Sequence, residues 1–103
     1  MTTIYVDADA CPVKDEIVRV ALRHRLPVAM VSNSWMCTDP DPLVEMVVVE
    51  QGADVADDWI AERAGQGDIV ITRDIPLAAR CLGSGSVVLD ADGRPFTEAG
   101  IGS

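Results

Sequence analysis

Several features that identify common protein classes are missing from this chain of 103 residues. No apolar run approaches the ~20 residues that span a bilayer, and no basic segment followed by an apolar one opens the chain, so we expect a cytoplasmic protein without membrane contact. The single histidine, His24, leaves no base for a Ser-His-Asp or Cys-His arrangement. Cys11, Cys37 and Cys81 form no C-x-x-C pair, which argues against a zinc knuckle or a disulfide framework. We expect Cys37 and Cys81 to be small packing residues.

Positive charge is also scarce. Eight basic residues stand against 17 acids, which gives a formal net charge of −9. This balance opposes a binding mode built on broad phosphate neutralisation. It leaves a nuclease open, because bound cations can invert the local field at an acidic site. A chain of this length is expected to form one domain around a single aliphatic core.

The apolar segments predict an α/β protein. Runs rich in Val and Ile are typical of buried strands, and they occur at 3–7, 28–32, 44–49, 68–72 and 86–89. Helical patterns alternate with them at 12–25, 53–63 and 75–82. The first helix is expected to bury an apolar stripe of Val13, Ile17, Val20, Ala21 and Leu22. This alternation indicates a three-layer α/β/α sandwich with a mainly parallel sheet of about five strands.

Acidic residues follow most of the predicted strands. The stretch Asp7-Ala8-Asp9-Ala10-Cys11-Pro12-Val13-Lys14 comes directly after the first strand and places two carboxylates roughly 6–7 Å apart. Like charges so close cost free energy unless a positive group lies between them. Further acids follow the later strands: Asp54, Asp57, Asp58, Asp74, Asp90 and Asp92. Because ligands of open parallel sheets bind beyond the carboxyl ends of the strands, we expect these acids on one rim.

Each acid also has a structural interpretation. Asp54 and Asp74 stand where Asp is a preferred helix N-cap, and Asp57 and Asp58 suit a helix N-terminus through its dipole. Asp54 and Asp58, however, are a like-charge i,i+4 pair, which costs about 0.2–0.5 kcal/mol. Several such choices on one rim favour a shared divalent cation, Mg²⁺ or Mn²⁺, which prefers oxygen ligands.

Lys14 and Arg73 are the basic residues closest to this rim in the sequence. One interpretation is that they hold a phosphate, and the other is that they are counter-ions that soften the repulsion between the acids. Asp90 and Asp92 are the weakest candidates, because Asp92-Gly93 is explained as a tight turn.

Three stretches resemble the signatures of the bacterial YaiI/YqxD family, in the same order and across essentially the whole chain. They are Asp7-Ala8-Asp9-Ala10-Cys11-Pro12-Val13-Lys14, Gly52-Ala53-Asp54-Val55-Ala56-Asp57-Asp58-Trp59-Ile60 and Gly67-Asp68-Ile69-Val70-Ile71-Thr72-Arg73-Asp74-Ile75-Pro76-Leu77-Ala78. That family is itself similar to PIN-like nuclease domains. The resemblance implies a parallel α/β sandwich with an acidic cluster at the carboxyl edge of its sheet.

The resemblance also implies roles for individual residues. Asp7 matches the PIN acid that ends the first strand, and Asp54 or Asp57 takes the part of the mid-chain helical acid. Thr72-Arg73-Asp74 resembles the Thr-x-Asp element after the fourth strand. Family members usually run further, through a C-terminal segment rich in Gly, Pro and basic residues. Residues 1–103 are therefore expected to form a single PIN-like domain without that segment.

The leading hypothesis is a metal-dependent phosphodiesterase acting on nucleic acid, RNA more than DNA. We expect its catalytic residues to be Asp7, Asp9, Asp54, Asp57 and Asp74, its metal ligands Asp7, Asp54, Asp58 and Asp74, and its substrate-binding residues Lys14, Asn33, Thr72 and Arg73. The metal would lower the pKa of a bound water and stabilise charge in the transition state. A homo-oligomer remains open.

Two rival hypotheses remain. One is a non-catalytic PIN-like module that binds metal or nucleotide. The other is a phosphatase of the haloacid-dehalogenase kind, with Asp7 as nucleophile, Asp9 as acid and Ser32-Asn33 as the second motif. Cys11 departs from the Thr or Val expected in that first motif, which makes this the weaker of the enzyme hypotheses.

Overall fold

The structure is a computed structural model that describes residues 2–10, 14–52 and 54–96. Its strands are β1 (Ile4–Asp7), β2 (Val28–Ser32), β3 (Val44–Val48), β4 (Ile69–Ile71) and β5 (Val87–Leu89). Its helices are α1 (Lys14–Arg23), α2 (Val55–Arg63), α3 (Ile75–Gly83) and a short 3-10 helix, η1 (Ala8–Ala10). The predicted strands and helices are present, with ends that differ by a residue or two, whereas η1 was not predicted. The expected helix start at Pro12 lies outside the described residues.

The five strands form one sheet in the order β3-β2-β1-β4-β5, and every pair of neighbours is parallel. β1 lies in the centre, with Val6 opposite Met30 on one side and opposite Ile71 on the other. The chain first builds the sheet from β1 outward to β3 and then crosses to the far side of β1 to begin β4. This reversal creates a switch point between the carboxyl ends of β1 and β4, where ligands of such sheets bind.

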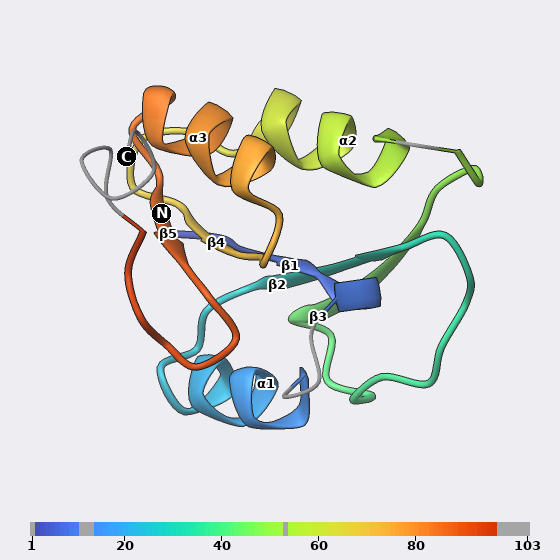
Figure 1. Cartoon of the computed structure of the whole chain (residues 1–103). Helices are drawn as coiled ribbons and strands as arrows, with labels where there is room; N and C mark the ends of the chain where they lie inside the picture. Colours follow the sequence, from blue (N-terminus) through green and yellow to red (C-terminus); the bar gives the residue numbers. More distant parts are fainter. Residues whose placement is uncertain (1, 11–13, 53, 97–103) are drawn as a thin grey trace.

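Helices cover both faces of the sheet, as expected for a three-layer sandwich (Figure 1). α1 packs on one face against a core that includes Ile4, Val6 and Met30. α2 and α3 pack on the opposite face, over a core that includes Val70 and Leu77. None of the helices among the described residues is long and apolar enough to cross a membrane.

The apolar stripe expected on α1 is only partly correct. Val18 and Ala21 are the buried residues of this helix, whereas Val20 is 51% exposed. Val20 lies about 200° around the helix from Val18 but only about 100° from Ala21, so it falls at the edge of the buried side. Val13 lies outside the described residues.

The cysteines differ in burial. Cys81 lies on α3 and is buried in the core, as expected for a small packing residue. Cys37 is exposed, so the same expectation is wrong there, because the segment after β2 runs over the surface. Cys11 lies outside the described residues.

Candidate functional site

Asp7 and Thr72 face each other at the switch point of the sheet. Asp7 ends β1 and is 7% exposed, and Thr72 directly follows β4 and is 2% exposed. The Thr72 hydroxyl donates a hydrogen bond to Asp7 Oδ2 at 3.0 Å and accepts one from the backbone N–H of Asp74 at 3.0 Å. One buried hydroxyl therefore positions Asp7 and also the residue that begins α3.

Asp9, in η1, is held by the end of β2. Its two carboxylate oxygens accept hydrogen bonds from the Ser32 hydroxyl at 2.6 Å and from the backbone N–H of Asn33 at 3.0 Å. The Ser32 hydroxyl in turn accepts a hydrogen bond from the backbone N–H of Ser34 at 3.1 Å. The side-chain amide of Asn33 donates to the Glu50 carbonyl at 3.2 Å. These bonds fix the orientation of Asp9 and tie together the chain segments that leave β1, β2 and β3.

The two expected helix caps behave differently. Asp74 accepts a hydrogen bond from the Leu77 backbone N–H at 2.8 Å, which is the side-chain cap expected at the start of α3. Asp54 stands at the N-cap position of α2, but its carboxylate makes no cap hydrogen bond with the described residues of the helix. Its backbone is left-handed, with φ 68°, a conformation that an L residue adopts at a cost. Helix capping therefore does not account for the Asp54 carboxylate.

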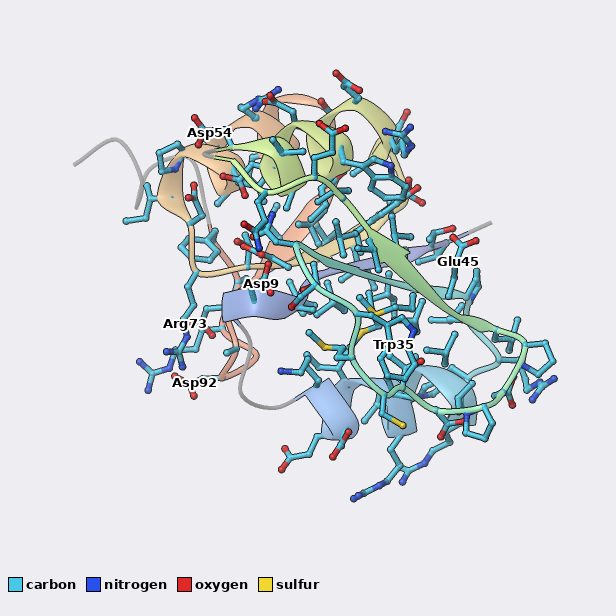
Figure 2. The ribbon with its side chains drawn as sticks, turned by 90° about the vertical axis from the view of Figure 1, so that its right-hand side faces the viewer. Asp9, Trp35, Glu45, Asp54, Arg73 and Asp92 are labelled. Atoms are coloured by element: carbon cyan, nitrogen blue, oxygen red, sulfur yellow. The ribbon has the colours of Figure 1, made fainter. Side chains whose placement is uncertain are left out.

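Four carboxylates share one small cavity, of about 130 Å³, at the carboxyl edge of the sheet. They are Asp7, Asp9, Asp54 and Asp57, and the remaining lining residues are Asn33, Gly52 and Ala56. Figure 2 looks onto this edge and shows Asp9 near its middle, Asp54 on the α2 side, Arg73 and Asp92 to one side and Trp35 to the other. We call this the acidic cavity. Of the acids expected on one rim, Asp7, Asp9, Asp54 and Asp57 thus share this cavity, whereas Asp58, Asp74, Asp90 and Asp92 do not line it.

Burial, and after it the crowding of negative charge, raises the pKa of two of these groups. The pKa of Asp57 is raised to about 6, first by burial and then by the charges of Asp74, Asp7 and Asp54, with a further rise from a hydrogen bond to Asp74. Burial also raises the pKa of Asp7, opposed by the Thr72 hydrogen bond and reinforced by the charges of Asp9 and Asp74. The ionised forms are therefore disfavoured unless a cation or a proton offsets the repulsion.

The donor set has the chemistry of a hard-cation site, because carboxylate oxygens are the ligands that Mg²⁺ and Mn²⁺ prefer. Among the described residues, however, no group of three or more His, Cys, Asp or Glu side chains is arranged to hold a metal ion. The acidic cavity therefore fits a divalent cation by composition and by its excess negative charge, without a closed coordination shell.

The other expected site residues lie around the acidic cavity rather than in it. Asp58 points away, and its carboxylate pairs with the Arg80 guanidinium at 2.7 Å on the exposed side of α2 and α3. The Lys14 ammonium donates to the Ala8 carbonyl at 3.3 Å, close to the turn between Asp7 and Asp9. Arg73 is exposed at the same edge (Figure 2).

Two features of the site differ from the roles assigned by sequence. Thr72, expected to bind substrate, is buried and acts as a positioning residue beneath Asp7. Ser32, which was not among the expected site residues of the leading hypothesis, makes the shortest hydrogen bond to Asp9. A signal for Ser32 existed, because a serine that ends an otherwise apolar buried strand needs a hydrogen-bond partner there.

Comparison with known proteins agrees with the resemblance seen in the sequence. The family described as uncharacterised BCR, YaiI/YqxD family, matches residues 5–103. A UPF0178 protein of Parvibaculum lavamentivorans is 68% identical over 102 residues, covering 99% of this chain and 67% of its own length. UPF0178 proteins of Ruegeria pomeroyi and Bradyrhizobium diazoefficiens are 62% and 58% identical, covering 99% and 98% of this chain and 66% and 60% of their own lengths. The chain thus spans about two thirds or less of these relatives. No solved structure matches it.

Proposed function

This chain belongs to the YaiI/YqxD family, and because that family's description names no activity, we propose from the site that the chain is a divalent-cation-dependent phosphodiesterase acting on nucleic acid, RNA more than DNA. The observation that carries the proposal is the convergence of Asp7, Asp54 and Asp57 on one cavity at the switch point of a parallel sheet. Helix capping accounts for Asp74, and the hydrogen bonds at the end of β2 account for Asp9. No such structural role accounts for the carboxylates of Asp54 and Asp57, whose crowding costs free energy.

In this proposal Asp7, Asp54 and Asp57, which line the acidic cavity, hold Mg²⁺ or Mn²⁺, and Asp74 supports them through its hydrogen bond with Asp57. A bound divalent cation supplies a water of lowered pKa and stabilises charge on phosphoryl oxygens. The chain's own groups prepare this site: the Thr72 hydroxyl orients Asp7. Asp58 is left out of the ligand set because it pairs with Arg80.

The substrate side of the proposal rests on two basic residues and on the openness of the edge. Lys14 lies at the turn between Asp7 and Asp9, and Arg73 is exposed beside the same edge. In this proposal both residues meet a phosphate that approaches the acidic cavity. Because the whole chain carries a net charge of −9 and only these two basic residues are proposed to meet phosphate, we expect binding that is local to this edge, with few phosphate contacts and a shallow dependence on salt.

A second candidate is a cation-binding module without catalysis. One observation favours it: the net charge of −9 opposes binding of nucleic acid, whereas it suits binding of a cation. The phosphatase hypothesis needs Asp9 as a free acid, whereas both Asp9 oxygens already accept hydrogen bonds.

The deciding experiment measures cleavage of single-stranded RNA in Mn²⁺ together with Mn²⁺ binding. Asp7→Asn should abolish cleavage while leaving the circular dichroism spectrum unchanged. Asp92→Asn is the matched control, because Asp92 is an exposed acid at the same edge that does not line the acidic cavity. Cleavage that survives in Asp7→Asn overturns the nuclease proposal. Mn²⁺ binding by the unmodified chain without any cleavage supports the second candidate.

A further inference from the structure

The two faces of the sheet are covered unequally. Five strands at a spacing of about 4.8 Å make a sheet about 19 Å wide between its outer strands, and a helix with its side chains is about 10 Å across. α2 and α3 together cover one face (Figure 1). On the other face, the described residues place α1 alone. That face therefore has room for one more helix.

The uncovered strip is an apolar groove of about 400 Å³ between α1 and the β1-β4-β5 half of the sheet. Its floor includes Ile69, Ile71 and Leu89, and its α1 wall includes Ile17 and Val20. The other flank of α1 lies under the segment after β2, whose Met36 packs on the core of this face. On the groove side the segment after β5 forms the edge, with Ala91 packed on the same core, but no helix among the described residues covers the floor.

Two exposed valines lie along this strip. Val20, in the groove wall, is 51% exposed. Val87 lies two residues before Leu89 on the same face of β5 and is 52% exposed. Apolar surface that is contiguous with a core, rather than scattered singly, is typical of a site covered by another element.

The rim of the groove is polar and mainly acidic. Glu16 and His24 border it on α1, and Asp90 and Asp92 border it at the turn after β5. A helix that fits such a groove presents an apolar stripe at helical spacing, flanked by Lys or Arg side chains that face the acids.

The relatives contain chain beyond the part that matches. The Parvibaculum lavamentivorans and Bradyrhizobium diazoefficiens proteins match essentially all of this chain with only 67% and 60% of their own lengths. We propose that the groove between α1 and β4-β5 seats an amphipathic helix from the part of these relatives that has no counterpart in this chain. This inference does not depend on the proposed function, because no residue of the acidic cavity lines the groove.

The test supplies the unmatched part of a relative in trans. The probe is a separately produced polypeptide that comprises the unmatched part of the Parvibaculum lavamentivorans protein, and its binding to this chain is measured by isothermal titration calorimetry. We expect a one-to-one complex, with affinity reduced more than tenfold by Val20→Asp or by Val87→Asp. Val48→Asp is the matched control, because Val48 is also 51% exposed but lies on β3, the opposite edge strand.

Two results would overturn the proposal. One is the absence of binding, or an equal loss of affinity in Val48→Asp. The other is self-association of this chain in sedimentation equilibrium that Val20→Asp abolishes, since a second copy would then occupy the groove. Circular dichroism of each variant separates loss of binding from loss of the fold, and Val87→Asp serves if Val20→Asp fails to fold.

Discussion

The Thr72 hydroxyl donates a hydrogen bond to the Asp7 carboxylate across 65 positions of sequence, at 3.0 Å. The bond joins the carboxyl ends of β1 and β4 at the point where the order of strands reverses. It is the interaction that lets a nearly buried carboxylate stand at the bottom of the acidic cavity, because a buried charge needs a donor. The stability and acid strength of the site should therefore depend on this single hydroxyl.

Thr72→Val should lower the free energy of unfolding at pH 7 by about 1–3 kcal/mol, the usual cost of leaving a buried acceptor without its donor. The same change should raise the pKa of Asp7 further, because the Thr72 hydrogen bond is what opposes the rise caused by burial. The loss of stability should shrink as the pH falls and Asp7 becomes protonated. Urea unfolding at pH 7 and pH 4 measures both effects.

Thr72→Ser is the matched control, because it keeps the hydroxyl that binds Asp7 and the Asp74 backbone. It should retain most of the stability that Thr72→Val loses. If both variants unfold alike, the methyl group of Thr72 matters and the hydrogen bond does not.

The raised pKa of Asp57 predicts a particular dependence of stability on pH. Its value of about 6 in the folded protein lies above the ordinary 3.8, so the folded state binds more protons between those values. The contribution of Asp57 is therefore largest at low pH, and stability falls as the pH rises toward 6 and above. Allowing for solvent screening of the partly exposed group, we expect a fall of roughly 1–2 kcal/mol.

The measurement is urea unfolding in EDTA from pH 4.5 to pH 7.5. Asp57→Asn removes the titrating group and should flatten the curve, with a higher free energy of unfolding than the unmodified chain at pH 7. Curves of the same slope for both proteins would show that the repulsion around Asp57 has no effect on stability.

The fold was largely predictable because its signals are local. Runs of Val and Ile such as 28–32 lie in a fully buried strand, and their hydrophobicity is enough to identify it. Which side of a helix is buried is less local: Val18 and Val20 are the same residue type on α1, and only the packing of the helix decides that Val18 is covered. The unequal cover of the two sheet faces could not be deduced, because it depends on strand order.

The location of the candidate site could be predicted from the sequence, but the part that each side chain plays there could not. That Asp7 and Asp57 lie near each other follows from parallel strands ending at one edge. That Asp58 turns to Arg80 while its neighbour Asp57 lines the cavity depends on how α2 rotates against α3. The same limit applies to Asp54 and Asp74, which precede their helices alike although only Asp74 makes a side-chain cap.

Divalent cations should stabilise the folded chain if the acidic cavity binds them. At a Mn²⁺ concentration ten times the dissociation constant, the free energy of unfolding at pH 7 should rise by about 1.4 kcal/mol relative to EDTA. Asp7→Asn should remove most of this gain. Asp58→Asn should keep it, because Asp58 is engaged with Arg80 outside the cavity. Thermal unfolding with and without Mn²⁺ makes the comparison, and a gain lost equally in both variants would contradict the assignment of the ligands.

Asp54→Gly tests whether Asp54 lowers the stability of the fold while it contributes to cation binding in the acidic cavity. Asp54 has φ 68°, which glycine adopts without a steric penalty, and its charge helps to raise the pKa of Asp57. Removing the side chain should therefore leave the free energy of unfolding unchanged or raise it by up to about 1 kcal/mol. It should also lower the pKa of Asp57 toward its ordinary value and reduce the stabilisation by Mn²⁺.

Asp54→Asn completes this comparison, because asparagine tolerates the left-handed backbone while it removes the charge. It should match Asp54→Gly in the loss of Mn²⁺ stabilisation and in the pKa of Asp57, which an NMR titration of the carboxyl carbons measures. It should gain less stability, because the backbone strain is only partly relieved. If removing the Asp54 carboxylate stabilises the fold but weakens cation binding, Asp54 serves the site and not the fold. If both variants unfold more easily than the unmodified chain at pH 7 in EDTA, Asp54 instead supports the start of α2 and its role in the acidic cavity is refuted.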